Sequence, residues 1–263
     1  MTSAPTLTPE LERILDSVPA VPVATDALRY SCGDAELEGY LAAPADAAGP
    51  RPAVLVLHDW AGMTDHVRVR AQMLARLGYV ALAGDVFGVD EQPASPEESA
   101  ALAGRYYGDV ELFRARVLAN LDALRADPRV DTARIAVMGY CFGGSGALEA
   151  ARAGADVRGV VSFHGGLGTG APAEAGSVTA SVLVLTGADD PMVPVSAVAE
   201  FQDEVRGAGA PDWQVVSYSD ALHAFAVPGA DAPEHGVAYQ ETADRRSWVA
   251  PPGPGAPPPP FHI

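Results

Sequence analysis

The sequence predicts an α/β fold with a mostly parallel central sheet and helices on both faces. Short apolar runs, suited to strands buried on both faces, alternate along the chain with amphipathic segments of helical length. The 263 residues are 48% hydrophobic, which is enough to bury one large core. We expect one domain over residues 25–249, an N-terminal extension over 1–24, and a tail over 250–263 whose prolines favour an extended or disordered chain.

The first elements precede this alternation. Residues 10–17 suit a short helix, and two alternating runs within 28–43 flank a Cys-Gly-Asp turn, which predicts a β-hairpin. The uninterrupted apolar run at 53–57 is typical of a strand buried on both faces. An amphipathic helix is expected over 65–77, where a glycine ends it.

The alternation then continues through the rest of the domain. Further strands are expected at residues 79–83, 135–138, 157–163, 182–185 and 213–218. Helices are expected at residues 96–107, 110–126, 144–153 and 195–207, and a last one can begin after 238. Because helices separate most of these strands, the strands are expected to run parallel.

Charge and cysteine content exclude several classes of protein. The net charge is −17 and all 17 basic residues are arginines, so we expect no nucleic-acid partner. The N-terminus lacks the pattern of a signal peptide and no apolar run is long enough to cross a bilayer, which predicts a cytoplasmic protein. The two cysteines lie far apart, so we expect no disulfide framework, metal or cofactor. A monomer or a small homo-oligomer is expected.

The segment Gly139-Tyr140-Cys141-Phe142-Gly143 joins an expected strand to an expected helix. It matches the sharp Gly-x-nucleophile-x-Gly turn of α/β-hydrolases, with cysteine in the place of serine. The outer positions must be small, because side chains there would collide with neighbouring backbone. The helix N-terminus points its partial positive charge at the sulfur, which favours the thiolate, and the Phe142 N–H is placed to donate to an oxyanion. Cys141 is therefore the candidate nucleophile.

Other interpretations of this segment stay open. Cys141 could be a small buried residue at a strand end, since free cysteines are often buried. The glycines could cradle a phosphate, although the segment lacks the ending of a P-loop and the spacing of a dinucleotide fingerprint. Ser145 is a second candidate nucleophile, but it falls one turn into the helix rather than at the bend.

A nucleophilic cysteine needs a base, and the base needs an orienting carboxylate. In this type of fold they follow the nucleophile in the order acid, then histidine. Asp189 and Asp190 come just after the expected strand at 182–185, and His223 lies in the loop after the last strand. We select Asp190 and His223 as the candidate acid and base. The two aspartates could instead form a turn and cap the next helix, and His223 could be an ordinary loop histidine.

Two further segments supply candidates. This fold places its second oxyanion donor after the first buried strand, where the backbone N–H of Trp60 is the candidate. Asp59 is an acid beside the expected site, and its alternative role is to cap the next helix or form a turn. His164 ends the strand at 157–163, where it either lines the pocket as a substrate contact or packs against its neighbours.

From about residue 28 to residue 248 the sequence resembles the dienelactone hydrolase family, the cysteine branch of the α/β-hydrolases. The blocks that carry the resemblance are LHDWAGMTDHVR, GYVALAGDVFG, GYCFGG, GADDPMVP and ALHAF. The resemblance implies an α/β-hydrolase fold and a Cys-Asp-His triad, here Cys141, Asp190 and His223. It also implies a carboxylate that holds the resting thiol and helps to deprotonate it. Asp59 stands at that position, one methylene shorter than the glutamate of the type enzymes.

The resemblance further implies arginines that hold a substrate carboxylate. Arg105, in the expected helix at 96–107, is the candidate for one of them. Val227 stands near the place of another, shortly after His223, so that charged contact is missing. One such contact is worth about 1.5–3 kcal/mol, so its loss weakens the binding of an anionic substrate.

We interpret the sequence as that of a carboxylic ester hydrolase. It is expected to cleave an ester or lactone, such as an enol lactone of the dienelactone type, through a thioester intermediate. The expected partner is this small-molecule substrate. A thioesterase or a broad carboxylesterase on the same fold is the first alternative, and a non-catalytic binding protein that keeps the pocket is the second.

Overall fold

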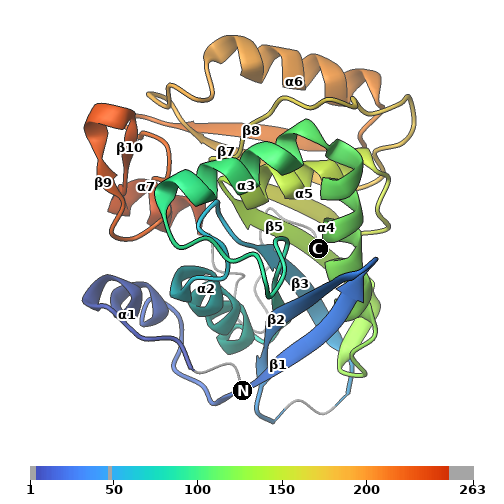
Figure 1. Ribbon diagram of the computed structural model, residues 1–263, viewed down its shortest axis with the longest axis vertical. Coiled ribbons are helices and arrows are strands. Elements are labelled where there is room, and N and C mark those ends of the chain that lie inside the picture. Colours follow the sequence, from blue (N-terminus) through green and yellow to red (C-terminus); the bar gives the residue numbers. More distant parts are fainter. Residues whose placement is uncertain (1–3, 47–48, 249–263) are drawn as a thin grey trace.

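The computed structural model describes residues 4–46 and 49–248. The strands of its main sheet are β1 (Val23–Cys32), β2 (Ala35–Pro44), β3 (Arg51–Leu57), β4 (Val80–Gly84), β5 (Val130–Tyr140), β6 (Gly159–Phe163), β7 (Ser181–Gly187) and β8 (Trp213–Tyr218). They lie in the order β1-β2-β4-β3-β5-β6-β7-β8 (Figure 1). β2 runs antiparallel to both β1 and β4, and every pairing from β4 to β8 is parallel. The predicted mostly parallel sheet is confirmed.

Helices cover both faces of this sheet (Figure 1). They are α1 (Pro9–Leu15), α2 (Asp65–Arg76), α3 (Pro96–Gly108), α4 (Val110–Arg125), α5 (Phe142–Arg152), α6 (Val195–Gly207) and α7 (Glu241–Ser247). A small ribbon of β9 (Asp231–Ala232) and β10 (Val237–Ala238) encloses the 3-10 turn η1 (Pro233–His235). Among the described residues, no helix is both long and apolar enough to span a membrane.

The two faces of the sheet form two apolar cores. α3, α4, α5 and α6 share one core with the sheet, and α2 and α7 share the other. In β3, Leu55 and Leu57 belong to the first core and Val54 and Val56 to the second, because successive side chains of a strand point to opposite faces. Burial of each of these side chains contributes about 1.5–3 kcal/mol to the free energy of unfolding. The unbroken apolar run therefore reflects burial on both sides.

The N-terminal elements differ somewhat from the prediction. β1 begins at Val23, inside the segment expected as an extension, because Val23 and Ala24 pair with Pro44 and Ala43 of β2. Most of β1 is exposed at the edge of the sheet, so its residues lack a strong apolar alternation. The proline-rich tail predicted for 250–263 lies outside the described residues.

α1 matches the short helix predicted near the N-terminus. Its apolar residues Leu11, Ile14 and Leu15 pack on Val69 and Met73 of α2. This contact gives α2 a second apolar neighbour on the side that faces away from the sheet. The segment before β1 is thus tied to the domain by side-chain burial.

α5 lies directly against the end of β3, without side chains between the two backbones. A Cβ atom on Gly143 would overlap the carbonyl oxygen of Leu57, and one on Gly139 would overlap the carbonyl of Gly143. α5 begins at Phe142, two residues earlier than predicted, since only Cys141 separates the helix from β5. The small residues predicted at both outer positions of the turn are therefore required by backbone packing.

We expect the substitution Gly143→Ala to lower the free energy of unfolding by more than about 2 kcal/mol, because the added Cβ must displace backbone. Gly104→Ala in α3 is the matched control, since its Cβ would have no atom within 4 Å. That change should raise the free energy of unfolding by roughly 0.5–1 kcal/mol. Urea denaturation measures both, and equal stabilities of the two variants would contradict the close approach.

Candidate active site

Cys141 occupies a strained turn between β5 and α5. Its φ of 52° and ψ of −114° lie outside the regions that L-residues ordinarily adopt. Two backbone hydrogen bonds hold this turn. The Cys141 N–H donates to the Phe163 carbonyl at 2.9 Å, and the Ser145 N–H donates to the Cys141 carbonyl at 3.1 Å. The structure therefore places Cys141 at a sharp bend between a strand and a helix, where the sequence predicted it.

His223 and Asp190 meet Cys141 from two other loops. His223 Nε2 lies 3.1 Å from Cys141 Sγ, and His223 Nδ1 lies 2.9 Å from Asp190 Oδ2. Because an ionised carboxylate only accepts hydrogen bonds, Nδ1 carries a hydrogen and donates it to Asp190. The other carboxylate oxygen accepts the Met192 N–H at 2.8 Å, which fixes the orientation of the acid. Residues from three separate sequence blocks thus form one hydrogen-bonded chain.

Only one of the two neighbouring aspartates belongs to this chain. Asp190 is 4% exposed and contacts His223, whereas Asp189 is exposed and its N–H donates to the Ala221 carbonyl at 3.0 Å. The choice of Asp190 therefore agrees with the geometry. Few water molecules can compete for a carboxylate this buried, which strengthens its hydrogen bond to His223.

The surroundings of His223 favour its protonated form. Burial by itself lowers the pKa of the imidazole. The hydrogen bonds to Asp190 and Cys141, together with the charges of these groups, outweigh burial and raise the pKa of His223 to about 10. An imidazolium within hydrogen-bond distance of sulfur is arranged to stabilise a thiolate. The hydrogen-bonded residues Cys141 and His223 can therefore transfer a proton between the sulfur and the imidazole ring.

A buried ion pair supports the loop that carries His223. The Ala238 N–H donates to the His223 carbonyl at 3.0 Å, which joins this loop to β10. Arg70 of α2, only 1% exposed, donates to the Ala226 carbonyl at 2.9 Å and to Asp244 Oδ1 of α7 at 2.6 Å. Sequence analysis did not find this pair, because its members lie 174 residues apart and neither stands in a recognisable motif.

The loop after β3 is shaped by two buried polar side chains. His58 Nε2 accepts the Val86 N–H at 3.1 Å, so Nδ1 carries the hydrogen that bonds to the Asp59 carbonyl at 2.6 Å. Asp59 Oδ1 accepts the Ala61 N–H at 2.8 Å. Burial raises the pKa of Asp59, and the hydrogen bond from Ala61 opposes this rise. Trp60 lies between Asp59 and Ala61 in the sequence, and its side chain is 41% exposed.

The predicted oxyanion donors both border the same space as Cys141. Phe142 is the first residue of α5, so its N–H is one of those that a helix leaves without an intrahelical acceptor. The ring of Phe142 is fully buried and stacks on Phe113 of α4 with centroids 4.5 Å apart, which anchors the start of the helix. Trp60 and Phe142 line one cavity together with Cys141 and His223.

This cavity has a volume of about 1020 Å³ and lies at the carboxyl ends of the parallel strands. Its apolar wall includes Trp60, Tyr107, Val110, Phe113, Met192 and Val227. An apolar pocket with a few convergent polar groups is typical of a small-molecule site. Among the described residues, no group of three or more histidine, cysteine or acidic side chains is arranged to hold a metal ion.

Comparison with known proteins identifies the family. The model of the dienelactone hydrolase family matches residues 37–251. The chain belongs to this family. The resemblance noted in the sequence is therefore confirmed over nearly the whole predicted domain.

Several members and relatives of the dienelactone hydrolase family are similar to the chain. A crystal structure of a dienelactone hydrolase-like promiscuous phosphotriesterase from metagenomic libraries is 39% identical, with a TM-score of 0.80 over 86% of this chain and 94% of that one. The dienelactone hydrolase of Anabaena variabilis is 26% identical, with a TM-score of 0.59 over 79% and 91% of the two chains. A Methylorubrum extorquens protein named "Putative carboxymethylenebutenolidase" is 28% identical over 77% of this chain and 75% of its own length. The family and the fold make the chain a carboxylic ester hydrolase.

Arg105 was predicted to contact the substrate, but it does not line the cavity. Its guanidinium donates twice to Glu91, at 2.8 and 2.6 Å, and it is absent from the described residues that line the cavity. The cavity face of α3 includes Ala100, Ala103 and Tyr107, which follow helical spacing. Arg105 falls off that face, so its charge is directed to Glu91.

His164 also differs from its predicted role as a substrate contact. It is fully buried behind His223, with the two rings edge to face at 5.2 Å, and does not line the cavity. Burial takes the pKa of His164 well below its ordinary value, helped by the nearby charge of His223. A neutral ring packed against His223 supports that side chain, which is the packing role that the sequence left as its alternative.

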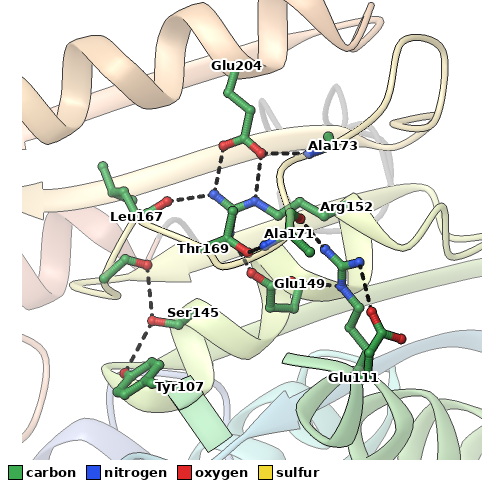
Figure 2. A network of polar contacts seen from close by, with 12 residues as sticks. Tyr107, Glu111, Ser145, Glu149, Arg152, Leu167, Thr169, Ala171, Ala173 and Glu204 are labelled. Atoms are coloured by element: carbon green, nitrogen blue, oxygen red, sulfur yellow. Dashed lines mark hydrogen bonds and ion pairs between the residues drawn. The ribbon is translucent and has the colours of Figure 1, made fainter. Parts of the chain in front are cut away.

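Figure 2 shows a polar network that sequence analysis did not find. Arg152 of α5 donates to both carboxylate oxygens of Glu204 on α6, at 2.9 and 2.8 Å, and to the Leu167 carbonyl at 2.6 Å. Glu149 accepts from Arg152 at 2.9 Å and from Arg114 of α4 at 2.8 Å. These bonds hold the loop after β6, which forms one side of the cavity.

Ser145, the second candidate nucleophile, belongs to the same framework. It lies one turn into α5, and its Oγ donates to the Gly166 carbonyl at 3.0 Å (Figure 2). The Tyr107 hydroxyl lies 3.4 Å from the same Oγ. The geometry thus joins Ser145 to the loop after β6, whereas Cys141 alone occupies the bend and contacts His223.

We expect the substitutions Cys141→Ala and Asp190→Asn each to lower the pKa of His223 from its value of about 10. Each change removes a negative charge that stabilises the imidazolium. Cys141→Ala also removes a hydrogen bond to the ring. NMR titration of ring-labelled histidine follows the shift. An identical titration of His223 in the wild type and in both variants would contradict the hydrogen-bonded chain.

We expect Arg152→Met to lower the free energy of unfolding by about 3–5 kcal/mol, because it leaves Glu204 without its guanidinium partner and Glu149 with Arg114 alone. The side chains of Arg152 and Glu149 are 3% and 4% exposed. Arg134→Met is the matched control, since Arg134 pairs with Asp131 at the surface, and its stability should stay close to that of the wild type. Chemical denaturation compares the two, and a similar small effect of both changes would count against the role of the network.

Proposed function

We propose that the chain hydrolyses esters or lactones by covalent catalysis, with Cys141 as nucleophile, His223 as base and Asp190 as the residue that orients His223. The hydrogen-bonded chain carries this proposal. Its distances of 3.1 Å from sulfur to Nε2 and 2.9 Å from Nδ1 to the carboxylate are those expected of nucleophile, base and orienting acid. The strained backbone at Cys141 gives independent support, since it presents the sulfur at the bend.

The first step forms a thioester. His223 holds the proton taken from the Cys141 thiol, and the thiolate attacks the carbonyl carbon of the substrate. A carbon–sulfur bond forms while the carbonyl π electrons move onto oxygen. The N–H groups of Phe142 and Trp60 donate to this oxyanion, and loss of one such donor typically costs about 10²–10³ in kcat.

The tetrahedral intermediate then collapses. The carbon–oxygen bond to the leaving group breaks, and the His223 imidazolium donates its proton to the departing oxygen. Water enters, His223 takes its proton, and hydroxide adds to the thioester carbon. Collapse of this second intermediate releases the carboxylic acid and regenerates the Cys141 thiolate. Enol-type and strained esters suit the scheme best, because their leaving groups depart easily.

Asp59 acts in this scheme through the loop that carries the second oxyanion donor. Its Oδ1 bonds to the Ala61 N–H, on the far side of Trp60, so it shapes the backbone from which the Trp60 N–H is presented. The sulfur of Cys141 has its contact with His223 instead. This arrangement favours a positioning role for Asp59 over one in holding the resting thiol.

A broad carboxylesterase is a second candidate, favoured by the size of the cavity. Its volume of about 1020 Å³ is at the upper end of the range for small-molecule pockets and leaves room around a single small lactone ring. The same three residues would carry out the chemistry, so the two candidates differ only in the range of acyl and alcohol groups that are accepted.

We expect Cys141→Ala and His223→Ala each to reduce kcat for ester hydrolysis by at least about 10⁴-fold, since residues of one catalytic unit fail together. With the wild type and a slowly deacylating ester, mass spectrometry should find the acyl group on the peptide that contains Cys141. Hydroxylamine should remove it, as it does from a thioester.

Two variants serve as controls for this assignment. Cys32→Ser alters the other cysteine, which lies in β1, and should leave kcat unchanged. Ser145→Ala tests the other candidate nucleophile and should retain the acyl-enzyme on Cys141. Full esterase activity in Cys141→Ala, or an acyl group on Ser145, would overturn the proposed nucleophile.

A further inference from the structure

Few ionisable side chains line the cavity. Two of the residues that line it are acidic, Asp59 and Glu149, and two are histidines, His223 and His235. No arginine lines the cavity among the described residues, and the chain contains no lysine. The catalytic histidine already has two partners in Asp190 and Cys141.

Three arginines beside this wall are engaged by other groups. Arg152 uses its nitrogens on Glu204, Glu149 and a backbone carbonyl (Figure 2). Arg114 bonds to Glu149 at 2.8 Å and to the Ala171 carbonyl at 2.6 Å. Arg105 is paired with Glu91 outside the cavity. These guanidinium groups are therefore not free to bind an anion in the cavity.

The remaining histidine does not replace them. The side chain of His235 is 77% exposed, and Glu234 lies 3.7 Å from it, so any positive charge there is both screened by solvent and offset by a carboxylate. Val227, in the loop that follows His223, adds an apolar surface to the cavity. The walls away from the reacting groups are thus mainly aromatic and aliphatic.

We infer that the substrates of this site are uncharged esters, whose acyl or alcohol group packs against the apolar wall of the cavity. Esters and lactones that carry a carboxylate are poor substrates. This inference rests on the proposed function. A carboxylate entering the cavity would give up water without gaining a charged partner from its wall. An uncharged group of the same size gives up little hydration and gains the apolar contacts.

A matched pair of esters tests the inference. The mono-4-nitrophenyl ester of adipic acid carries a free carboxylate, and its methyl ester replaces that charge with a small uncharged group. Both have the same scissile 4-nitrophenyl ester bond. We expect kcat/KM to be about 10- to 100-fold higher for the uncharged ester, the factor that one charge-assisted contact represents. A smaller ratio, or a preference for the anionic ester, would overturn the inference and leave the proposed function standing.

A charge placed in the wall gives a second, independent readout. Val227→Arg should improve kcat/KM for the anionic ester relative to the uncharged one, whereas Val227→Met, which adds bulk without charge, should leave the wild-type ratio in place. Both variants are compared with the wild type by thermal melting. If the two substitutions change the ratio equally, volume and not charge sets the selectivity, and the inference is wrong.

The outcomes separate this inference from the proposed function. Cys141→Ala should abolish turnover of both esters whatever their ratio in the wild type. Turnover that survives in this variant, or its absence for both esters in the wild type, would overturn the proposed function and with it the inference.

Discussion

The contact between the backbones of α5 and β3 is the constraint on which the site depends. Gly143 lets the helix approach the end of β3, and Gly139 lets the chain turn back on itself within a single residue. That residue is Cys141, whose φ of 52° is stabilised only because the strand and the helix on either side are fully packed. The same approach brings the free N–H of Phe142 next to the loop after β3. The positions of the Cys141 sulfur and the Phe142 N–H therefore share one geometric cause.

Asp190 and His223 reach this point because parallel strands end at the same edge of the sheet. Asp190 follows β7 and His223 follows β8, so their loops converge in space although they are far apart in the sequence. Loops on their own are mobile, and buried hydrogen bonds and ion pairs restrict the movement of the loops that form this site. Arg70 and Asp244 hold the His223 loop, and Arg152, Glu149 and Glu204 hold the loop after β6. The charged groups of the framework thus bind to one another and position these loops.

This division of charge determines the character of the cavity. Because Arg114 and Arg152 are paired with carboxylates of the framework, the wall that a substrate meets is mainly apolar. Under the proposed function, the Cys141–His223 pair is the polar feature towards which the carbonyl of an otherwise apolar ester is directed. Family membership alone would not have indicated this, since it depends on where each guanidinium points.

The sequence by itself determined the order of strands and helices along the chain and the bend at Cys141, and it narrowed the candidate partners of Cys141 to His223 and one of two adjacent aspartates. These features rest on local patterns, such as the apolar run of β3 or the glycines around Cys141, and local patterns depend on neighbours along the chain. Only the tertiary structure decided that Asp190 and not Asp189 contacts His223, that Arg105 turns to Glu91, and that His164 lies behind His223. It also revealed the pairs that join distant residues, such as Arg70 with Asp244. Side-chain direction and long-range pairing depend on which surfaces meet, and residue type and spacing carry no information about that.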